Sequence, residues 1–214
     1  MNQQSTMTVT VTNAQHEVPV HRDRMVRVAK QAVRALRIRT HGTLAITFLG
    51  RRQIRTLNRR FLRHDRPTDV LSFRYDNNAG GKHHNTLGPE PSPPRPIDSW
   101  RAGRGAQPAP ANRFVEGGPG SPERMVVGEI FIAPALARAY AKTHGIPYQE
   151  ELARYIAHGL LHWLGHEDKT SAQQQRMRLL ENRLLQMVSD TYQIPSGGSR
   201  QSKRYLIPDG HPHH

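Results

Sequence analysis

Hydrophobic residues recur along this chain at two different spacings, and the spacing predicts where strands and helices lie. Short runs of apolar and β-branched residues, some in strict alternation, predict strands at residues 6–12, 44–48, 68–73 and 126–132. Apolar residues at steps of three and four share one face of a helix and therefore predict helices. These helices cover residues 22–36, a segment after Gly50, residues 135–142 and 148–164, and a last segment that opens at Thr170, where Thr170 and Gln173 form a capping-box pattern.

The segment 77–122 has almost no periodic apolar pattern. It holds nine of the 16 prolines and eight of the 17 glycines. Such a composition cannot bury enough surface to offset the entropy of ordering, so we expect an irregular insertion. The prediction is one α+β domain over residues 1–190, interrupted by this insertion and followed by a basic, flexible tail at 191–214. Its core is a mixed sheet of about four strands with helices packed on it.

Charge adds a candidate partner to this picture. The formal net charge is +14, from 31 basic and 17 acidic residues, and only five of the basic residues are lysines. Arginine binds phosphate oxygens in bidentate fashion and stacks on bases, so the bias favours a nucleic-acid partner. The alternative is an arginine-rich but otherwise ordinary surface.

Several classes of protein are disfavoured. The chain has no cysteine, which excludes disulfides and thiolate metal sites. No apolar run approaches the roughly 20 residues that span a bilayer, and the N-terminal residues lack the pattern of a signal peptide. We therefore expect a cytoplasmic protein with no membrane association.

The sequence HGLLHWLGHED, residues 158–168, carries the candidate chemistry. His158 and His162 are four residues apart on a predicted helix, so both imidazoles leave the same face and could bind one Zn²⁺ ion. Gly165 suits a left-handed helix end that turns the chain back toward these histidines. His166, Glu167 or Asp168 could then supply a third ligand. The alternative is a pair of hydrogen-bonded core histidines.

Gly159 separates this motif from the HExxH motif of metalloproteases, in which that position holds the glutamate that acts as general base. Peptide hydrolysis by the same mechanism would therefore lack its base. No general base can be assigned from the motif, although His166 and Glu167 are candidates.

Three segments in order resemble the YbeY family of bacterial endoribonucleases. Residues 158–168 are similar to the family pattern HGxLHLxGHDH, residues 57–73 (LNRRFLRHDRPTDVLSF) to its DxPTDVLSFP segment, and residues 128–135 (GEIFIAPA) to its GDIxIs segment. The resemblance implies an α+β fold with one zinc ion in a cleft. It also implies cleavage of single-stranded RNA, maturation of ribosomal RNA at the 16S 3′ end, and ribosome quality control, with RNA and the ribosome as partners.

The resemblance assigns zinc to His158 and His162, and the third family ligand falls on Asp168, where the family has histidine. Carboxylate oxygen is an ordinary zinc ligand, so we predict the set His158, His162 and Asp168, with His166 as the rival. The expected chemistry is metal-assisted hydrolysis of a phosphodiester bond.

Other positions depart from the family or stay open. The family's arginine after an aromatic residue is missing, because Leu62 follows Phe61. The arginines around this gap could supply the charge instead, although each of them could equally lie on a solvated helix face: Arg59, Arg60, Arg63 and Arg66. Glu129 is either a carboxylate behind the metal ligands or an ordinary strand residue, and Ser72 is either a substrate contact or an ordinary strand serine.

Two rival functions remain. One is a metalloprotease-like hydrolase built on a similar zinc helix. The other is a non-catalytic ribosome-binding factor whose zinc is structural, and a closed site with four ligands would favour it.

Overall fold

The computed structural model describes residues 7–75 and 125–192. The expected insertion at 77–122 lies outside the described residues. The expected tail at 191–214 lies outside them too, except for its first two residues, which end a helix.

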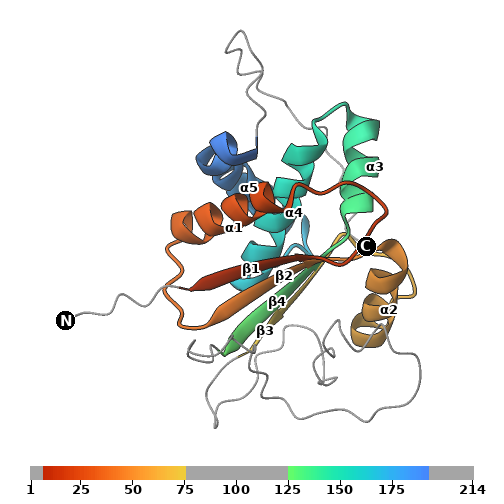
Figure 1. Ribbon diagram of the computed structural model, residues 1–214, viewed down its shortest axis with the longest axis horizontal. Coiled ribbons are helices and arrows are strands. Elements are labelled where there is room, and N and C mark those ends of the chain that lie inside the picture. The colour runs from red at the N-terminus through yellow and green to blue at the C-terminus, as the bar shows by residue number, and fades with distance from the viewer. Residues whose placement is uncertain (1–6, 76–124, 193–214) are drawn as a thin grey trace, which may run out of the picture.

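The centre of the fold is a four-stranded mixed sheet with the order β1-β2-β4-β3 (Figure 1). The strands are β1 (Thr8–Asn13), β2 (Thr43–Phe48), β3 (Val70–Arg74) and β4 (Val126–Ile132). β1, β2 and β4 are parallel, whereas β3 runs antiparallel to β4 at the edge. Nearly every residue of β2 is buried, as expected for a central strand that is covered on both faces.

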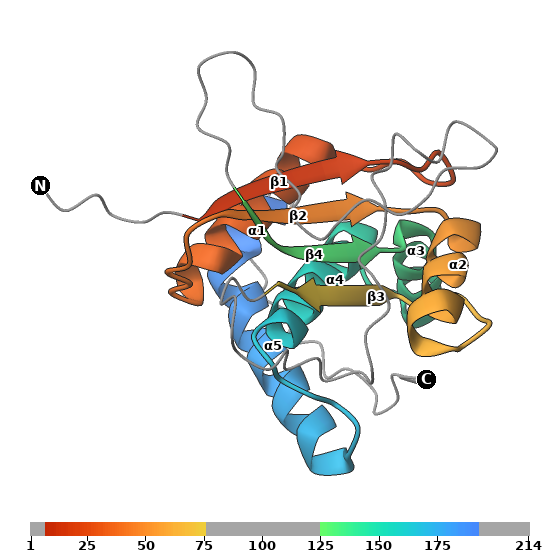
Figure 2. The same ribbon diagram turned by 90° about the horizontal axis from the view of Figure 1, so that it is seen from below.

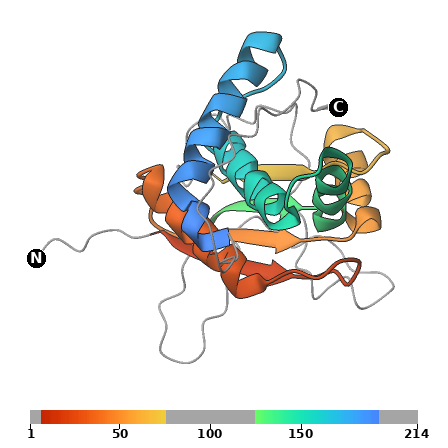
Figure 3. The ribbon, with the colours of Figure 1, turned by 90° about the horizontal axis from the view of Figure 1, so that it is seen from above.

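Five helices are present in the described ranges. They are α1 (Arg22–Ala35), α2 (Arg51–Leu62), α3 (Pro134–His144), α4 (Tyr148–Trp163) and α5 (Ser171–Tyr192). Seen from above, α1, α4 and α5 lie over one face of the sheet, with α3 beside α4 (Figure 3). Seen from below, α2 lies on the opposite side, near β3 and β4 (Figure 2).

Two apolar clusters hold these layers together. The larger one lies between the sheet and the layer of α1, α4 and α5, and it includes Ile46, Ile130 and Leu160. The smaller one joins α2 to the other face through Phe61 and Phe131. Removing this much apolar surface from water is the dominant stabilising term of the fold.

The predicted fold class is confirmed: the chain has an α+β fold with a four-stranded mixed sheet and helices packed on it. Each predicted strand and helix of the described ranges exists, and no predicted bound differs from the observed one by more than two residues. Among the described residues, no helix is long and apolar enough to cross a membrane.

Candidate metal centre

Helix α4 positions the first two candidate ligands. Twelve of its 16 residues are buried, because the helix lies between the sheet on one side and α1, α3 and α5 on the others. His158 is only 6% exposed. The side chain of His162, one turn later, is 29% exposed, so the site opens toward solvent at the C-terminal end of the helix.

The two imidazoles and one carboxylate converge on a single point. The Nε2 atoms of His158 and His162 are 3.0 Å apart, and Asp168 Oδ2 lies 3.9 Å from the first and 3.7 Å from the second. Tetrahedral zinc with bonds of about 2.0–2.1 Å separates its ligand atoms by about 3.3 Å. The observed distances bracket this value, so these donors fit one metal ion with little movement.

The remaining ring nitrogen of His158 contacts α5. Its Nδ1 lies 2.8 Å from Glu181 Oε1, and Glu181 is itself only 3% exposed. Burial disfavours the charged imidazolium and is the largest single effect, but the hydrogen bond and the negative charge of Glu181 act against it. Asp69 and Asp168 add negative charge, so the pKa of His158 lies above its usual value.

The turn between α4 and α5 places Asp168 beside the two histidines. Gly165 has a φ of +92°, the left-handed conformation that glycine adopts at least cost. A capping box then starts α5: the Gln173 side chain accepts from the Thr170 N–H at 2.9 Å, and the Thr170 hydroxyl accepts from the Gln173 N–H at 3.3 Å. Both the left-handed glycine and the capping box were expected from the sequence.

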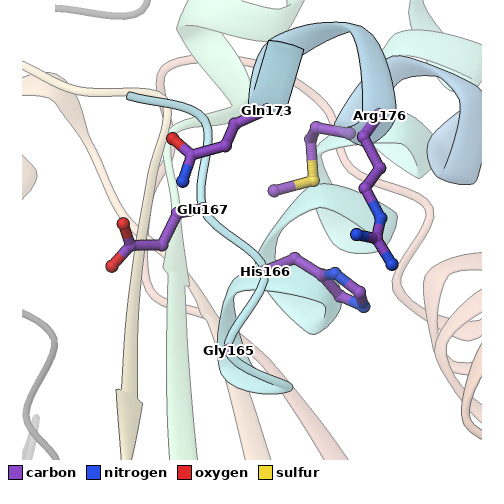
Figure 4. Close-up of a pocket in the computed structure, with 6 residues that line it drawn as sticks. Gly165, His166, Glu167, Gln173 and Arg176 are labelled. Atoms are coloured by element: carbon purple, nitrogen blue, oxygen red, sulfur yellow. The ribbon is translucent and has the colours of Figure 1, made fainter. Parts of the chain in front are cut away.

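His166, the rival third ligand, lies outside the group formed by His158, His162 and Asp168. It lines an open hollow of about 340 Å³ together with Arg176 and Gln173 of α5. Figure 4 shows the Arg176 side chain reaching from α5 toward the His166 ring. Burial lowers the pKa of His166, and the positive charges of Arg176 and His162 lower it further.

Gly159 faces the sheet and not the metal group. A Cβ atom at this position would lie 2.5 Å from Ile130 Cγ2 and 3.0 Å from Val70 Cγ1. The Gly159 carbonyl also accepts a hydrogen bond from Ser72 Oγ at 2.9 Å. The glycine therefore lets α4 approach the sheet closely, and Ser72 uses its hydroxyl proton to hold the two together.

The arginines expected to replace the family's arginine lie at the end of α2 and just after it. Arg59 is 3.8 Å from Asp65, and Arg60 lies over the Phe61 ring. Arg63 is the left-handed residue that ends α2, and the Arg66 carbonyl accepts a hydrogen bond from the Asn58 side chain.

Glu129 pairs with Phe73 in the sheet, whereas Ser72 pairs with Ile130 on the face that meets α4. Because neighbours along a strand point to opposite faces, Glu129 is directed away from the metal group. Its carboxylate accepts a hydrogen bond from the Tyr75 hydroxyl. Of the two interpretations of Glu129, the structure supports the ordinary strand residue.

Several residues near the centre were missed by the sequence reasoning. Glu181 and Arg154 form a buried polar layer behind His158. Arg74 lies over the ring of Trp163, the neighbour of His162, at 5.4 Å, and Arg176 lines the hollow beside His166. Only Glu181 and Arg154 carry a sequence signal, since each is a charged residue on the apolar face of its helix.

Comparison with known proteins points to one family. Residues 10–189 match the family model described as endoribonuclease YbeY. An endoribonuclease YbeY from Myxococcus xanthus is 31% identical over 160 residues, which are 73% of this chain but only 41% of that relative. One from Thermobifida fusca is 26% identical over 179 residues, 84% of this chain and 92% of the relative. The solution structure of TM1509 from Thermotoga maritima gives a TM-score of 0.46 at 15% identity, over 90% of this chain and 100% of that one.

Proposed function

The chain belongs to the endoribonuclease YbeY family, and from this premise we propose that it is a zinc-dependent endoribonuclease that cuts single-stranded RNA. The proposed role is maturation of ribosomal RNA, at the 3′ end of 16S RNA, and ribosome quality control in the cytoplasm. The observation that carries the catalytic part is the convergence of His158, His162 and Asp168 at distances that suit one metal ion.

The proposed ligand set leaves one coordination position of the zinc ion open for the reaction. Two histidines and one carboxylate hold zinc in hydrolases that keep a fourth position open for water or substrate. When bound, zinc lowers the pKa of a water toward about 7 and polarises a phosphoryl oxygen. His158 is buried and fixed, while His162 and Asp168 border the accessible side. A substrate phosphate therefore has to approach from the C-terminal end of α4.

Positive charge is available at this end of α4. Arg74 comes from β3 and Arg176 from α5, so the two reach the site from different elements. Guanidinium groups neutralise phosphate charge and bind its oxygens in bidentate fashion, which suits a single strand that passes the metal. Arg74 lies over the ring of Trp163, the residue after His162, and Arg176 lines the hollow beside His166, so these two side chains are our candidates for phosphate contact.

The two rival functions fit less well. In a metalloprotease of the HExxH type the general base would stand at Gly159, where a side chain would enter the contact with Ile130 and Val70. A purely structural zinc site needs a fourth protein ligand. Among residues 7–75 and 125–192, only three candidate donors converge.

The decisive experiment compares the parent protein with His162→Ala on single-stranded and duplex RNA of the same sequence. We expect the parent, loaded with zinc, to cut only the single strand, and a chelator or the substitution to abolish cleavage. His144→Ala is a matched control, because His144 lies on α3 and contacts Tyr140 instead of the metal group.

Cleavage by His162→Ala at the parental rate would overturn the metal mechanism. Equal cutting of duplex RNA would overturn the strand preference, and peptide hydrolysis without RNA cleavage would favour the protease-like rival. Reconstitution with Mn²⁺ or Fe²⁺ beside Zn²⁺ identifies the metal, because a set of two histidines and one carboxylate also suits non-haem iron.

A further inference from the structure

A layer of buried charged groups lies behind the candidate metal ligands, between α4 and α5. Glu151 is 0% exposed, Arg154 5% and Glu181 3%. Removing charges from water costs several kcal/mol for each ion unless partners compensate it, and apolar residues of the same volume are often at least as stabilising. Stability alone therefore gives a weak reason for this layer.

The two carboxylate oxygens of Glu181 serve different partners. Oε1 lies 2.8 Å from His158 Nδ1, whereas Oε2 lies 3.5 Å from an Arg154 Nη1 nitrogen. The same Arg154 nitrogen donates to Asn182 Oδ1 at 2.8 Å. The Arg154 Nε lies 3.6 Å from Glu151. Arg154 thus holds Glu181 in place, and Glu181 in turn faces the histidine ring.

This contact decides which nitrogen of His158 can bind a metal. A carboxylate accepts a hydrogen bond, so it stabilises the ring form with the proton on Nδ1 and a free lone pair on Nε2. Nε2 is the atom that faces His162 Nε2 at 3.0 Å and Asp168 Oδ2 at 3.9 Å. A carboxylate behind a metal-binding histidine also makes the imidazole a stronger donor.

We propose that Glu181 is a positioning residue for the metal centre, which fixes the ring orientation and tautomer of His158 and is itself anchored by Arg154. The inference rests on the metal site proposed above. It assigns to α5 a part in metal binding, although α5 supplies no ligand.

The test measures metal affinity on the folded apo-protein, by zinc competition with a chromophoric chelator. Glu181→Gln keeps the size of the side chain and removes its charge, and we expect zinc to bind about 10- to 100-fold more weakly, as is typical when such a partner is lost. The absorption spectrum of Co²⁺ bound to this variant should shift as well, because the His158 ring that binds the ion is held less firmly in place. Asn182→Ala is the matched control: it removes another hydrogen bond to Arg154 without touching the histidine, and we expect parental affinity.

A zinc affinity of Glu181→Gln equal to that of the parent would overturn the inference. Equal weakening of zinc binding in Glu181→Gln and Asn182→Ala would overturn it as well, because it would indicate that both residues belong to a purely structural network. If Glu181→Gln does not fold, histidine ¹⁵N NMR of the zinc-loaded parent protein tests the inference instead. A protonated Nδ1 and a metal-bound Nε2 on His158 support the inference, and metal on Nδ1 refutes it. A parent that binds zinc in this way but leaves RNA intact refutes the proposed function alone.

Discussion

Gly159 offers a sharp test of how α4 packs on the sheet, because a side chain at this position would meet the buried side chains of Ile130 and Val70. In Gly159→Ala the new methyl carbon would lie 2.5 Å from Ile130 Cγ2, well inside van der Waals contact, and 3.0 Å from Val70 Cγ1. Ile130 is 0% exposed and β-branched, so it has little freedom to move aside. Either α4 shifts away from the sheet or the isoleucine leaves its preferred rotamer.

Two opposing effects set the size of the change. Overpacking of a well-packed core costs about 1–3 kcal/mol. Replacing glycine by alanine in a helix interior returns about 1 kcal/mol. The steric cost is therefore the larger of the two, and we expect the free energy of unfolding to fall by roughly 1 kcal/mol, with an upper limit near 2.

Urea denaturation of four proteins measures this: the parent, Gly159→Ala, Ile130→Ala and the double variant. Ile130→Ala alone should cost about 2–5 kcal/mol, because it opens a cavity. In that background the alanine methyl no longer meets Cγ2, so Gly159→Ala should become close to neutral or stabilising. The coupling between the two sites should reach at least about 1 kcal/mol. Two results would refute the close approach of α4 to β4. One is a higher free energy of unfolding for Gly159→Ala than for the parent, and the other is an equal loss of this free energy in the parent and Ile130→Ala backgrounds.

Two further predictions concern the third ligand and the end of α2. Asp168→Ala should lose its metal on dialysis, by elemental analysis, whereas His166→Ala should keep it; equal metal content in both would contradict the assignment of the carboxylate. Asn58→Ala should lower the free energy of unfolding by about 1–3 kcal/mol, because the buried Asn58 amide donates to the Arg66 carbonyl at 2.8 Å. The control is Thr56→Ala, at a partly exposed position of the same helix, and a similar small effect in both variants would show that the Asn58 bond contributes little.

The sequence was sufficient for the features that depend on near neighbours in the chain. Periodic apolar residues located the helices and strands, and Gly165 and the Thr170–Gln173 pair marked the end of one helix and the start of the next. Strand order was not readable, because it depends on contacts between distant segments. Nothing in the apolar pattern of β3 shows that it pairs antiparallel with β4, a strand that starts more than 50 residues later.

The proposed metal centre shows the same division at the level of single atoms. The spacing of His158 and His162 follows from helix geometry alone, so the sequence could name the two residues. The choice between Nδ1 and Nε2 depends on Glu181, 23 residues after His158 and on another helix. That contact exists only after α4 and α5 have packed together, which in turn requires the turn at Gly165 to place α5 beside α4. A local motif can therefore name the donor residues, whereas the donor atom and its orientation are properties of the folded chain.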